Sequence, residues 1–412
     1  MNLFDYKGGE LFCEGVALSR IAADVGTPAY VYSAGTLRHH FNAFDGPFAG
    51  VQHITCFSLK SCSNLSIVRL FARMGSGVDI VSGGELYRAL KAGVPASRIV
   101  FSGVGKQAWE MRMALEAGIL MFNCESHDEL CALDAVARSM GRRAPISLRI
   151  NPDVDPATHH YIATGLKKSK FGIPIASARS EYLFARTLPG VEIVGVDCHI
   201  GSQLTQTSPF VEAVRKILEL ALELADDGVQ IRYFDIGGGL GITYDNETPP
   251  HPVEYAGEVI RELSSSGYTL VFEPGRVLVG NAGALLGRVI YLKENGVKRF
   301  VVVDTAMNDL IRPALYGAFH AIRPVVPRDG GGSVVDVVGP VCESSDFMAQ
   351  DRELGPVERG DLLAVMSAGA YGFAMSSNYN SRARAVEVLV DGDSYRVIRR
   401  RETLEDLVRG EE

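Results

Sequence analysis

The segment Ile54-Thr-Cys-Phe-Ser-Leu-Lys60 is an apolar run of strand length that ends in a lysine. Seven comparable runs follow, at 78–82, 99–102, 119–123, 146–150, 194–198, 233–236 and 270–273. Each run is continuously apolar and does not alternate, which is typical of strands buried on both faces of a parallel sheet. Because helical patterns separate the runs, the eight units predict a (β/α)8 TIM-type barrel. A doubly wound sheet is the alternative that the pattern leaves open.

Two of the intervening segments carry local helix signals. Ser126, followed by Glu129, has the spacing of a capping box at the start of a helix. The segment 211–225 has apolar residues at helical spacing, which predicts one buried face. That face would consist of Val211, Val214, Ile217, Leu218 and Leu222.

The pattern changes after residue 277. Strand-like runs at 289–292, 300–304, 334–338, 362–366 and 385–390 are separated by Gly, Pro and Asp turns, which predicts a mainly β domain. We therefore expect an N-terminal segment, residues 1–29, that joins the β domain. The barrel would comprise residues 30–277 and the C-terminal β domain residues 278–412.

Composition excludes several functional classes. The net charge is -8, whereas binding to nucleic acid phosphates needs a basic surface. No stretch of about 18 apolar residues predicts a membrane span. The N-terminus lacks the apolar core of a signal peptide, and the seven scattered cysteines show no metal-type spacing. We expect a cytoplasmic protein without a metal site and without a nucleic acid or membrane partner.

Glycine and arginine follow the seventh and eighth predicted strands, where barrels of this type frequently bind phosphate. Gly237-Gly238-Gly239 comes after the seventh strand, and Glu273-Pro-Gly275-Arg276 begins at the end of the eighth. Glycines allow backbone N–H groups to approach a phosphate, and Arg276 could add a charged contact. The other interpretation of the glycines is a tight turn. A dinucleotide site fits poorly, because Ile242 occupies the position of the third glycine.

Three further residues end predicted barrel strands and would face the same rim. Lys60 could react with an aldehyde if its pKa is lowered, although most single lysines are surface residues. The flat ring of His199 could stack on an aromatic ring or could belong to the core. Glu273 could pair with a protonated pyridine nitrogen. Amine, phosphate loop and carboxylate together are the parts of a pyridoxal phosphate (PLP) site.

The predicted β domain contains its own candidates. Cys342 precedes Glu343 and could be a proton donor or an inert buried thiol. Arg312 and Tyr371 lie in polar or glycine-rich segments, where either a functional or a structural role is open.

An ordered set of motifs covers nearly the whole chain. It comprises segments 57–61, 81–86, 160–165, 169–172, 199–203, 236–240, 273–276, 312–316, 339–346 and 368–372. This set resembles the fold-type III PLP-dependent decarboxylases, and among them most closely the diaminopimelate decarboxylases. The resemblance implies an alanine-racemase-like barrel with a C-terminal β domain. It also implies decarboxylation of meso-2,6-diaminopimelate to L-lysine and CO2, the last step of lysine biosynthesis.

The resemblance also implies roles for individual residues. Lys60 would bond covalently to PLP, His199 would stack on its ring, and Glu273 would pair with its nitrogen. Asp79 would lie near the cofactor, with Tyr371 touching both cofactor and substrate. The residues around the phosphate would be Ser202, Gly238, Gly239, Gly275 and Arg276.

The remaining implied roles concern the substrate. Arg276, Arg312 and Tyr316 would bind its distal carboxylate, and Glu343 its distal amino group. Cys342 would donate the proton. Cys342 and Glu343 would reach the partner's site, which implies a homodimer with shared active sites.

Several alternatives stay open. The nearest is a decarboxylase of another basic amino acid on the same fold: ornithine, arginine, lysine or carboxynorspermidine. A racemase is disfavoured by a carboxylate at the pyridine nitrogen. A PLP-binding protein without catalytic activity is disfavoured by the large C-terminal domain.

Overall fold

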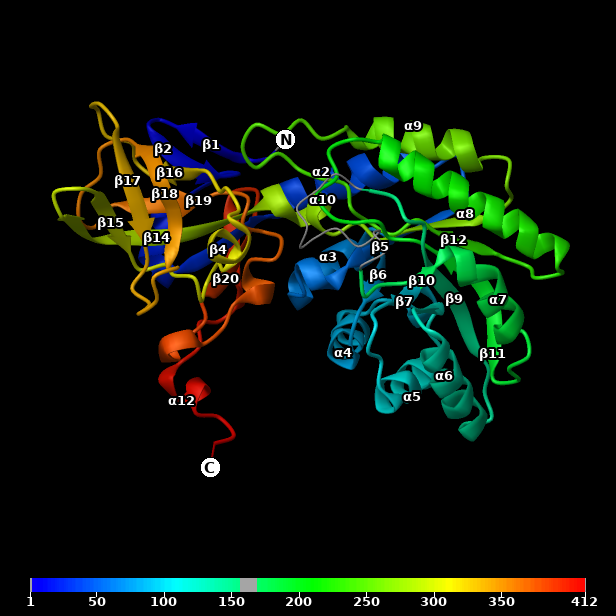
Figure 1. The fold of residues 1–412 in the computed structure, drawn as a ribbon. Helices are drawn as coiled ribbons and strands as arrows, with labels where there is room; N and C mark the ends of the chain where they lie inside the picture. The colour runs from blue at the N-terminus through cyan, green and yellow to red at the C-terminus, as the bar shows by residue number, and fades with distance from the viewer. Residues whose placement is uncertain (1, 156–168, 412) are drawn as a thin grey trace. The chain divides into compact units, whose positions relative to one another are not determined.

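The computed structural model describes residues 2–155 and 169–411 (Figure 1). The chain forms two compact units. The barrel unit comprises Phe41–Ile242 and Thr248–Val277, and the β unit comprises Met1–His40, Thr243–Glu247 and Leu278–Glu412. The motif at 160–165 lies outside the described residues.

The barrel unit is built on a closed ring of eight parallel strands. They are β5 (His53–Ser58), β6 (Gly77–Ile80), β7 (Ile99–Phe101), β8 (Met121–Cys124), β9 (Ala144–Asn151), β11 (Val191–Asp197), β12 (Tyr233–Asp235) and β13 (Thr269–Phe272). Each strand pairs with the next, and β13 pairs with β5. The predicted (β/α)8 barrel is confirmed, and the doubly wound alternative is wrong because such a sheet has open edges. The short β10 (Ile173–Pro174) extends the pairing of β9.

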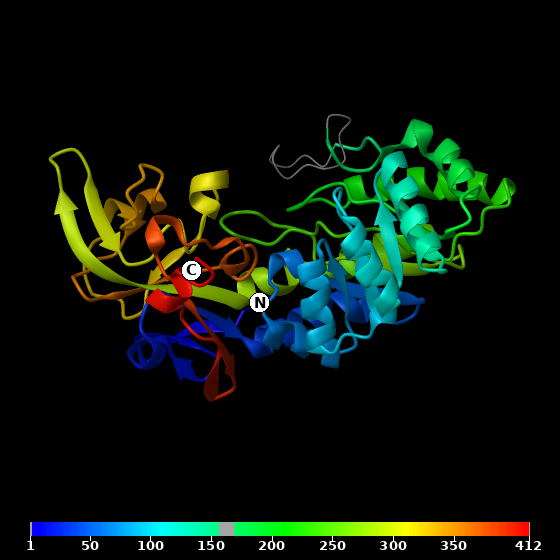
Figure 2. The ribbon, with the colours of Figure 1, turned by 90° about the horizontal axis from the view of Figure 1, so that it is seen from below.

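Helices surround this ring (Figures 1 and 2). They are α3 (Leu65–Arg73), α4 (Gly83–Ala92), α5 (Ala108–Ala117), α6 (His127–Ser139), α7 (Ile175–Ala185), α8 (Ser208–Asp226) and α9 (Pro252–Leu263). Successive helices pack against each other, as α3 does with α4 and α8 does with α9. Among the described residues, no helix is long and apolar enough to cross a membrane.

The buried face of α8 differs from the predicted one. Val214 and Ile217 are buried as predicted, but Leu222 is 57% exposed. The face is rotated toward Phe210 and Leu224, which are buried. The reason is a tertiary contact, since Phe210 packs edge-on against Tyr255 of α9 with ring centroids 4.9 Å apart.

The start of α6 also differs in one detail. The Ser126 hydroxyl accepts a hydrogen bond from the Glu129 backbone N–H, so the predicted N-cap is confirmed. The reciprocal hydrogen bond of a capping box, from the Ser126 backbone N–H to the Glu129 carboxylate, was predicted wrongly. The Glu129 carboxylate instead accepts from the backbone N–H of Glu125 at 2.8 Å and from Lys106 Nζ at 2.6 Å. A buried lysine therefore redirects this side chain.

The β unit is organised around β14 (Gly283–Glu294) in a mixed sheet. The strand order is β18 (Phe347–Leu354), β17 (Ser333–Val338), β15 (Arg299–Val303), β14, β4 (Ala29–Ser33), β20 (Val386–Asp391) and β21 (Ser394–Arg399). A second branch adds β19 (Leu362–Val365) and β16 (Ile322–Pro324). A separate small sheet contains β1 (Phe4–Lys7), β2 (Glu10–Cys13) and β3 (Val16–Ala17).

The N-terminal boundary of the barrel lies later in the chain than we expected. Residues 30–40 belong to the β unit, because β4 pairs with both β14 and β20 of that unit. The change of unit falls within α2 (Ala34–Asp45), between His40 and Phe41. The apolar sequence of β4 predicts a strand but does not show whether that strand joins the barrel or the sheet of the β unit.

The aromatic cluster behind β13 offers a test of what stabilises the barrel unit. Phe272 is fully buried, and its ring centroid lies 4.1 Å from that of Phe48. We expect Phe272→Ala to destabilise the unit by about 3–5 kcal/mol through lost burial and a cavity. Leu222→Ala, at an exposed position, is the control. Thermal unfolding, followed by circular dichroism, measures the effect. Equal melting temperatures for the two variants would contradict a stabilising role of the aromatic cluster.

Candidate active site

The C-terminal ends of the barrel strands gather the polar residues of the site. Lys60 lies in a 3-10 turn directly after β5, and its Nζ is 2.9 Å from Oδ2 of Asp79 in β6. The Ser58 hydroxyl donates to the same Asp79 oxygen at 2.5 Å. Asp79 is fully buried, whereas the Lys60 side chain is 36% exposed. The amine is therefore held in place and still reachable.

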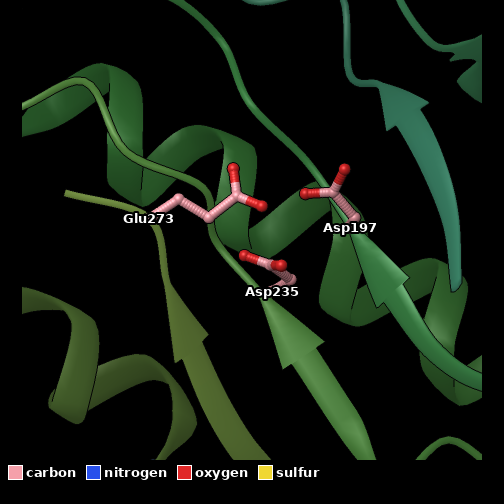
Figure 3. A group of neighbouring side chains, drawn as sticks. All are labelled: Asp197, Asp235 and Glu273. Carbon is pink, nitrogen blue, oxygen red and sulfur yellow. The ribbon is translucent and has the colours of Figure 1, made fainter. Parts of the chain in front are cut away.

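Three buried carboxylates lie at the ends of β11, β12 and β13 (Figure 3). They belong to Asp197, Asp235 and Glu273, and one oxygen from each lies within 4.8 Å of the others. Figure 3 shows the carboxylates turned toward a common space. Such a group can surround a single positive charge, as a protonated ring nitrogen provides.

These carboxylates have pKa values well above their usual range. Burial is the main cause for all three. The second cause is mutual repulsion, since Asp197 raises the pKa of Asp235 and Asp235 raises the pKa of Glu273. Upward pKa shifts that burial and neighbouring like charges cause are common at functional sites.

The glycine triplet packs against the segments that follow β11 and β13. The Gly238 N–H donates to His199 Nδ1 at 3.1 Å, and the Glu273 N–H donates to the Gly237 carbonyl oxygen at 2.7 Å. A Cβ at Gly238 would lie 2.1 Å from the Glu273 carbonyl oxygen. Gly239 has φ +120°, a conformation that side chains rarely adopt. The triplet is thus required by close packing as well as by its turn.

His199 is held as a neutral ring. Burial and the positive charges of Arg149 and Lys60 lower the pKa of His199 well below its usual range. Because Nδ1 accepts from Gly238, the proton is on Nε2. The ring is fixed in orientation and can lie against a flat cofactor.

The predicted phosphate residues lie beside each other. Arg276 is buried, and its Nη2 donates to the Ser202 hydroxyl at 2.9 Å. Gly275 lies against Ser58 and Ser61, because its Cβ would be 3.1 Å from both side chains. A guanidinium, a hydroxyl and glycine backbone on neighbouring loops are typical phosphate ligands.

Arg312 is a buried cation of the β unit. It begins α11 (Arg312–Tyr316), and its guanidinium carbon lies 5.0 Å from the ring centroid of Tyr244 and 5.9 Å from that of Tyr316. Arg312 Nε donates to His320 Nε2 at 3.3 Å. Since His320 Nδ1 is 2.8 Å from the Met366 carbonyl oxygen, that nitrogen donates and Nε2 accepts. The guanidinium is rigidly oriented.

Cys342 and Glu343 are both exposed on the loop before β18. The Cys342 N–H donates to Asn380 Oδ1 at 2.8 Å, and the Tyr379 hydroxyl donates to Glu343 Oε2 at 3.4 Å. Of the two interpretations of Cys342, the inert buried thiol is therefore wrong, and its role as a proton donor stays a prediction. Tyr371 has φ +55°, an uncommon conformation for a residue with a bulky side chain.

Several residues of the site were not identified from the sequence: Ser58, Asn123, Arg149, Asp197, Asp235, Tyr244 and His320. Asp197 and Asp235 end apolar strands just as Glu273 does, so the same signal applies to them. Asn123 and Arg149 lie inside β8 and β9, where only the barrel geometry turns them inward. Tyr244 and His320 carry no local signal.

The residues present fit PLP. The cofactor needs an amine for its aldehyde, a carboxylate for its ring nitrogen and donors for its phosphate. Lys60, Glu273 and the Ser202–Arg276 pair supply these three groups within one unit. The glycine backbone leaves space that a side chain would fill.

Comparisons with known proteins agree with this fit. Residues 34–280 match the family described as pyridoxal-dependent decarboxylase, pyridoxal binding domain. Diaminopimelate decarboxylase of Pseudomonas fluorescens is 54% identical over 412 residues, covering 100% of this chain and 99% of that protein. The chain belongs to the diaminopimelate decarboxylase family. Its predicted PLP dependence and carboxy-lyase class are thereby confirmed.

Solved structures of the family share the fold. Diaminopimelate decarboxylase from Helicobacter pylori, complexed with L-lysine, has a TM-score of 0.93 and 45% identity, covering 96% of this chain and 99% of that one. A lysine/ornithine decarboxylase from Vibrio vulnificus has a TM-score of 0.81, 20% identity and coverage of 91% and 97%. The second likeness concerns the fold alone.

The close approach at Gly238 yields a test of the glycine loop. We expect Gly238→Ala to weaken PLP binding by about tenfold or more, because the loop must move away from Glu273. Gly84→Ala is the matched control, since its Cβ would be 3.7 Å from the nearest atom. Affinities come from fluorescence titration of cofactor-free protein. Equal affinity in both variants would refute the packing argument.

Proposed function

We propose that the protein decarboxylates meso-2,6-diaminopimelate to L-lysine and CO2, the last step of lysine biosynthesis. The observation that carries this function is 54% identity to a curated diaminopimelate decarboxylase over the full length of both chains. The alternative, another basic amino acid, is not favoured, because the lysine/ornithine enzyme is only 20% identical.

The barrel unit binds and orients the cofactor. Lys60 would bond to the aldehyde of PLP, and Asp79 would hold the amine in place for that reaction. His199 would hold one face of the PLP ring, and Glu273 would accept a hydrogen bond from the ring nitrogen. When bound, PLP withdraws electrons from the substrate's Cα and so permits the loss of its carboxylate. The residues that would hold the phosphate are Ser202, Gly238, Gly239, Gly275 and Arg276.

Residues of the β unit select the substrate. Arg312, with Tyr316 and Arg276, binds the distal carboxylate. Support for this role comes from the burial of Arg312 and its fixed orientation by Tyr244 and His320. A site built to pair one ionic group strongly rejects a substrate that lacks it. Tyr371 contacts both cofactor and substrate.

Cys342 delivers the proton to Cα after the loss of CO2, and Glu343 accepts the distal ammonium group. Both side chains are exposed on their unit, which supports a homodimer in which they reach the partner's site. Scattered cysteines without paired spacing support a cytoplasmic location.

The substrate is tested by incubating the PLP-loaded protein separately with meso-diaminopimelate, L-ornithine, L-arginine and L-lysine. We expect CO2 and L-lysine from diaminopimelate alone, with the amine product measured by chromatography. Lys60→Ala is the control, and it should abolish turnover because it removes the amine that bonds to the cofactor. Turnover of a different amino acid would overturn the substrate but not the fold or cofactor.

The distal carboxylate is tested by Arg312→Lys. Lysine keeps the charge but loses the planar, two-pronged contact, so we expect KM for diaminopimelate to rise by about 10- to 100-fold. The exposed Arg323→Lys is the matched control in the same unit. Steady-state kinetics decide, and an unchanged KM for Arg312→Lys would reject its proposed role.

A further inference from the structure

The carboxylate cluster of Asp197, Asp235 and Glu273 has few hydrogen-bond donors for three buried acids. Asp235 Oδ1 accepts from the Gly237 N–H at 2.9 Å. Asn123 Nδ2 lies 3.3 Å from both Asp235 Oδ2 and Glu273 Oε1, so it spans the two acids. Within residues 2–155 and 169–411, Asp197 Oδ1 has no hydrogen-bond partner although it is buried. The hydrogen-bond donors around the cluster are therefore too few to stabilise three ionised carboxylates.

The surrounding charges do not neutralise the cluster either. Asp79 on β6 adds a fourth carboxylate, which repels Glu273. The positive groups that face Glu273 are Lys60 after β5 and Arg149 on β9. Each of them is already paired, Lys60 with Asp79 at 2.9 Å and Arg149 with Glu125 at 3.1 Å.

The other groups on neighbouring strands add no positive charge. His199, after β11, is neutral, because its pKa lies well below the usual range. The Ser102 hydroxyl, after β7, is uncharged and donates a hydrogen bond to Glu273 Oε1 at 3.1 Å. Three like charges at such short range in a buried site cannot all persist, so a proton is shared among them.

We propose that Asp197, Asp235 and Glu273 hold one proton among them in the cofactor-free protein, and that this proton is displaced when a protonated ring nitrogen binds to Glu273. This inference rests on the proposed role of Glu273. The incoming positive charge replaces the proton's charge, so all three carboxylates become ionised and the proton leaves to solvent. A ligand that arrives with an unprotonated nitrogen takes the proton directly. No bond between heavy atoms changes and no electrons are transferred.

Asp235 is a positioning residue, because it acts on Glu273 through Asn123. Through Asn123 it shares a hydrogen-bond donor with Glu273. Its second oxygen is fixed by Gly237, at the start of the glycine triplet. Asp235 therefore links the loop near the phosphate to the carboxylate near the ring nitrogen.

The test measures protons released on ligand binding to the full-length, cofactor-free protein. The ligand is 4-deoxypyridoxine 5'-phosphate, which has no aldehyde and so leaves Lys60 unmodified. Titration calorimetry in two buffers with different ionisation enthalpies gives the number of protons released. Asp235→Asn removes one carboxylate and retains an oxygen that can accept from Gly237. We expect wild type to release about one proton more per site than this variant.

Two comparisons make the result specific. With an analogue that carries C–H in place of the ring nitrogen, wild type and Asp235→Asn should release equal numbers of protons. Asp226→Asn, which removes an exposed carboxylate on α8, should match wild type with either ligand. If Asp235→Asn does not fold, Asp197→Asn carries the same expectation, because it also removes one acid from the cluster.

The outcomes separate this inference from the proposed function. Equal proton release by wild type and the cluster variant, with tight binding retained, would overturn the shared proton alone. A difference that persists with the C–H analogue would also overturn it, because the ring nitrogen would not be involved. Failure of wild type to bind the phosphate ester would reject the cofactor site itself.

Discussion

Closure of the eight-stranded ring is the constraint on which the rest of this structure depends. In a closed parallel barrel every strand ends on the same rim, so a polar residue at one strand end meets those of all the others. Lys60 and Glu273 are more than 200 residues apart, yet β13 pairs directly with β5. The backbone hydrogen bonds of that one strand pair place amine and carboxylate on adjacent strands.

The rim gathers charge in a buried setting, and the arrangement is consistent with a site prepared for a cation. Lys60 is matched by Asp79, and Arg149 by Glu125. The carboxylates on β11, β12 and after β13 have no cation of their own among the described residues. Burial without a matching charge is unfavourable for the isolated protein. In the role proposed for Glu273, a protonated ring nitrogen would supply the missing positive charge, so cofactor affinity and the pKa values of the cluster would depend on the same interaction.

The β unit contributes chemistry of a different kind. Its polar candidates do not share a rim; they come from loops and short helices set by a mixed sheet. Arg312 is fixed by ring contacts and by a histidine whose tautomer is determined by a backbone carbonyl. Cys342 and Glu343, in contrast, are exposed on a loop. A rigid buried guanidinium suits recognition of a fixed anion, whereas an exposed thiol and carboxylate are accessible from outside their unit, as the proposed homodimer requires.

The sequence by itself determined the barrel, its strands and the polar residues that follow the strands on one rim. Continuous apolar runs are typical of parallel strands covered on both faces, and in a closed barrel the residue after each run lies on the rim. The sequence could not show which sheet β4 joins or which face of α8 is buried. It also could not identify Asn123 and Arg149 as residues of the site. Those features follow from contacts between segments far apart in the chain, such as Phe210 with Tyr255. The local sequence pattern predicts which residues of one helix or strand are buried. The direction in which a side chain points inside a barrel is decided only by the strands and helices packed around it.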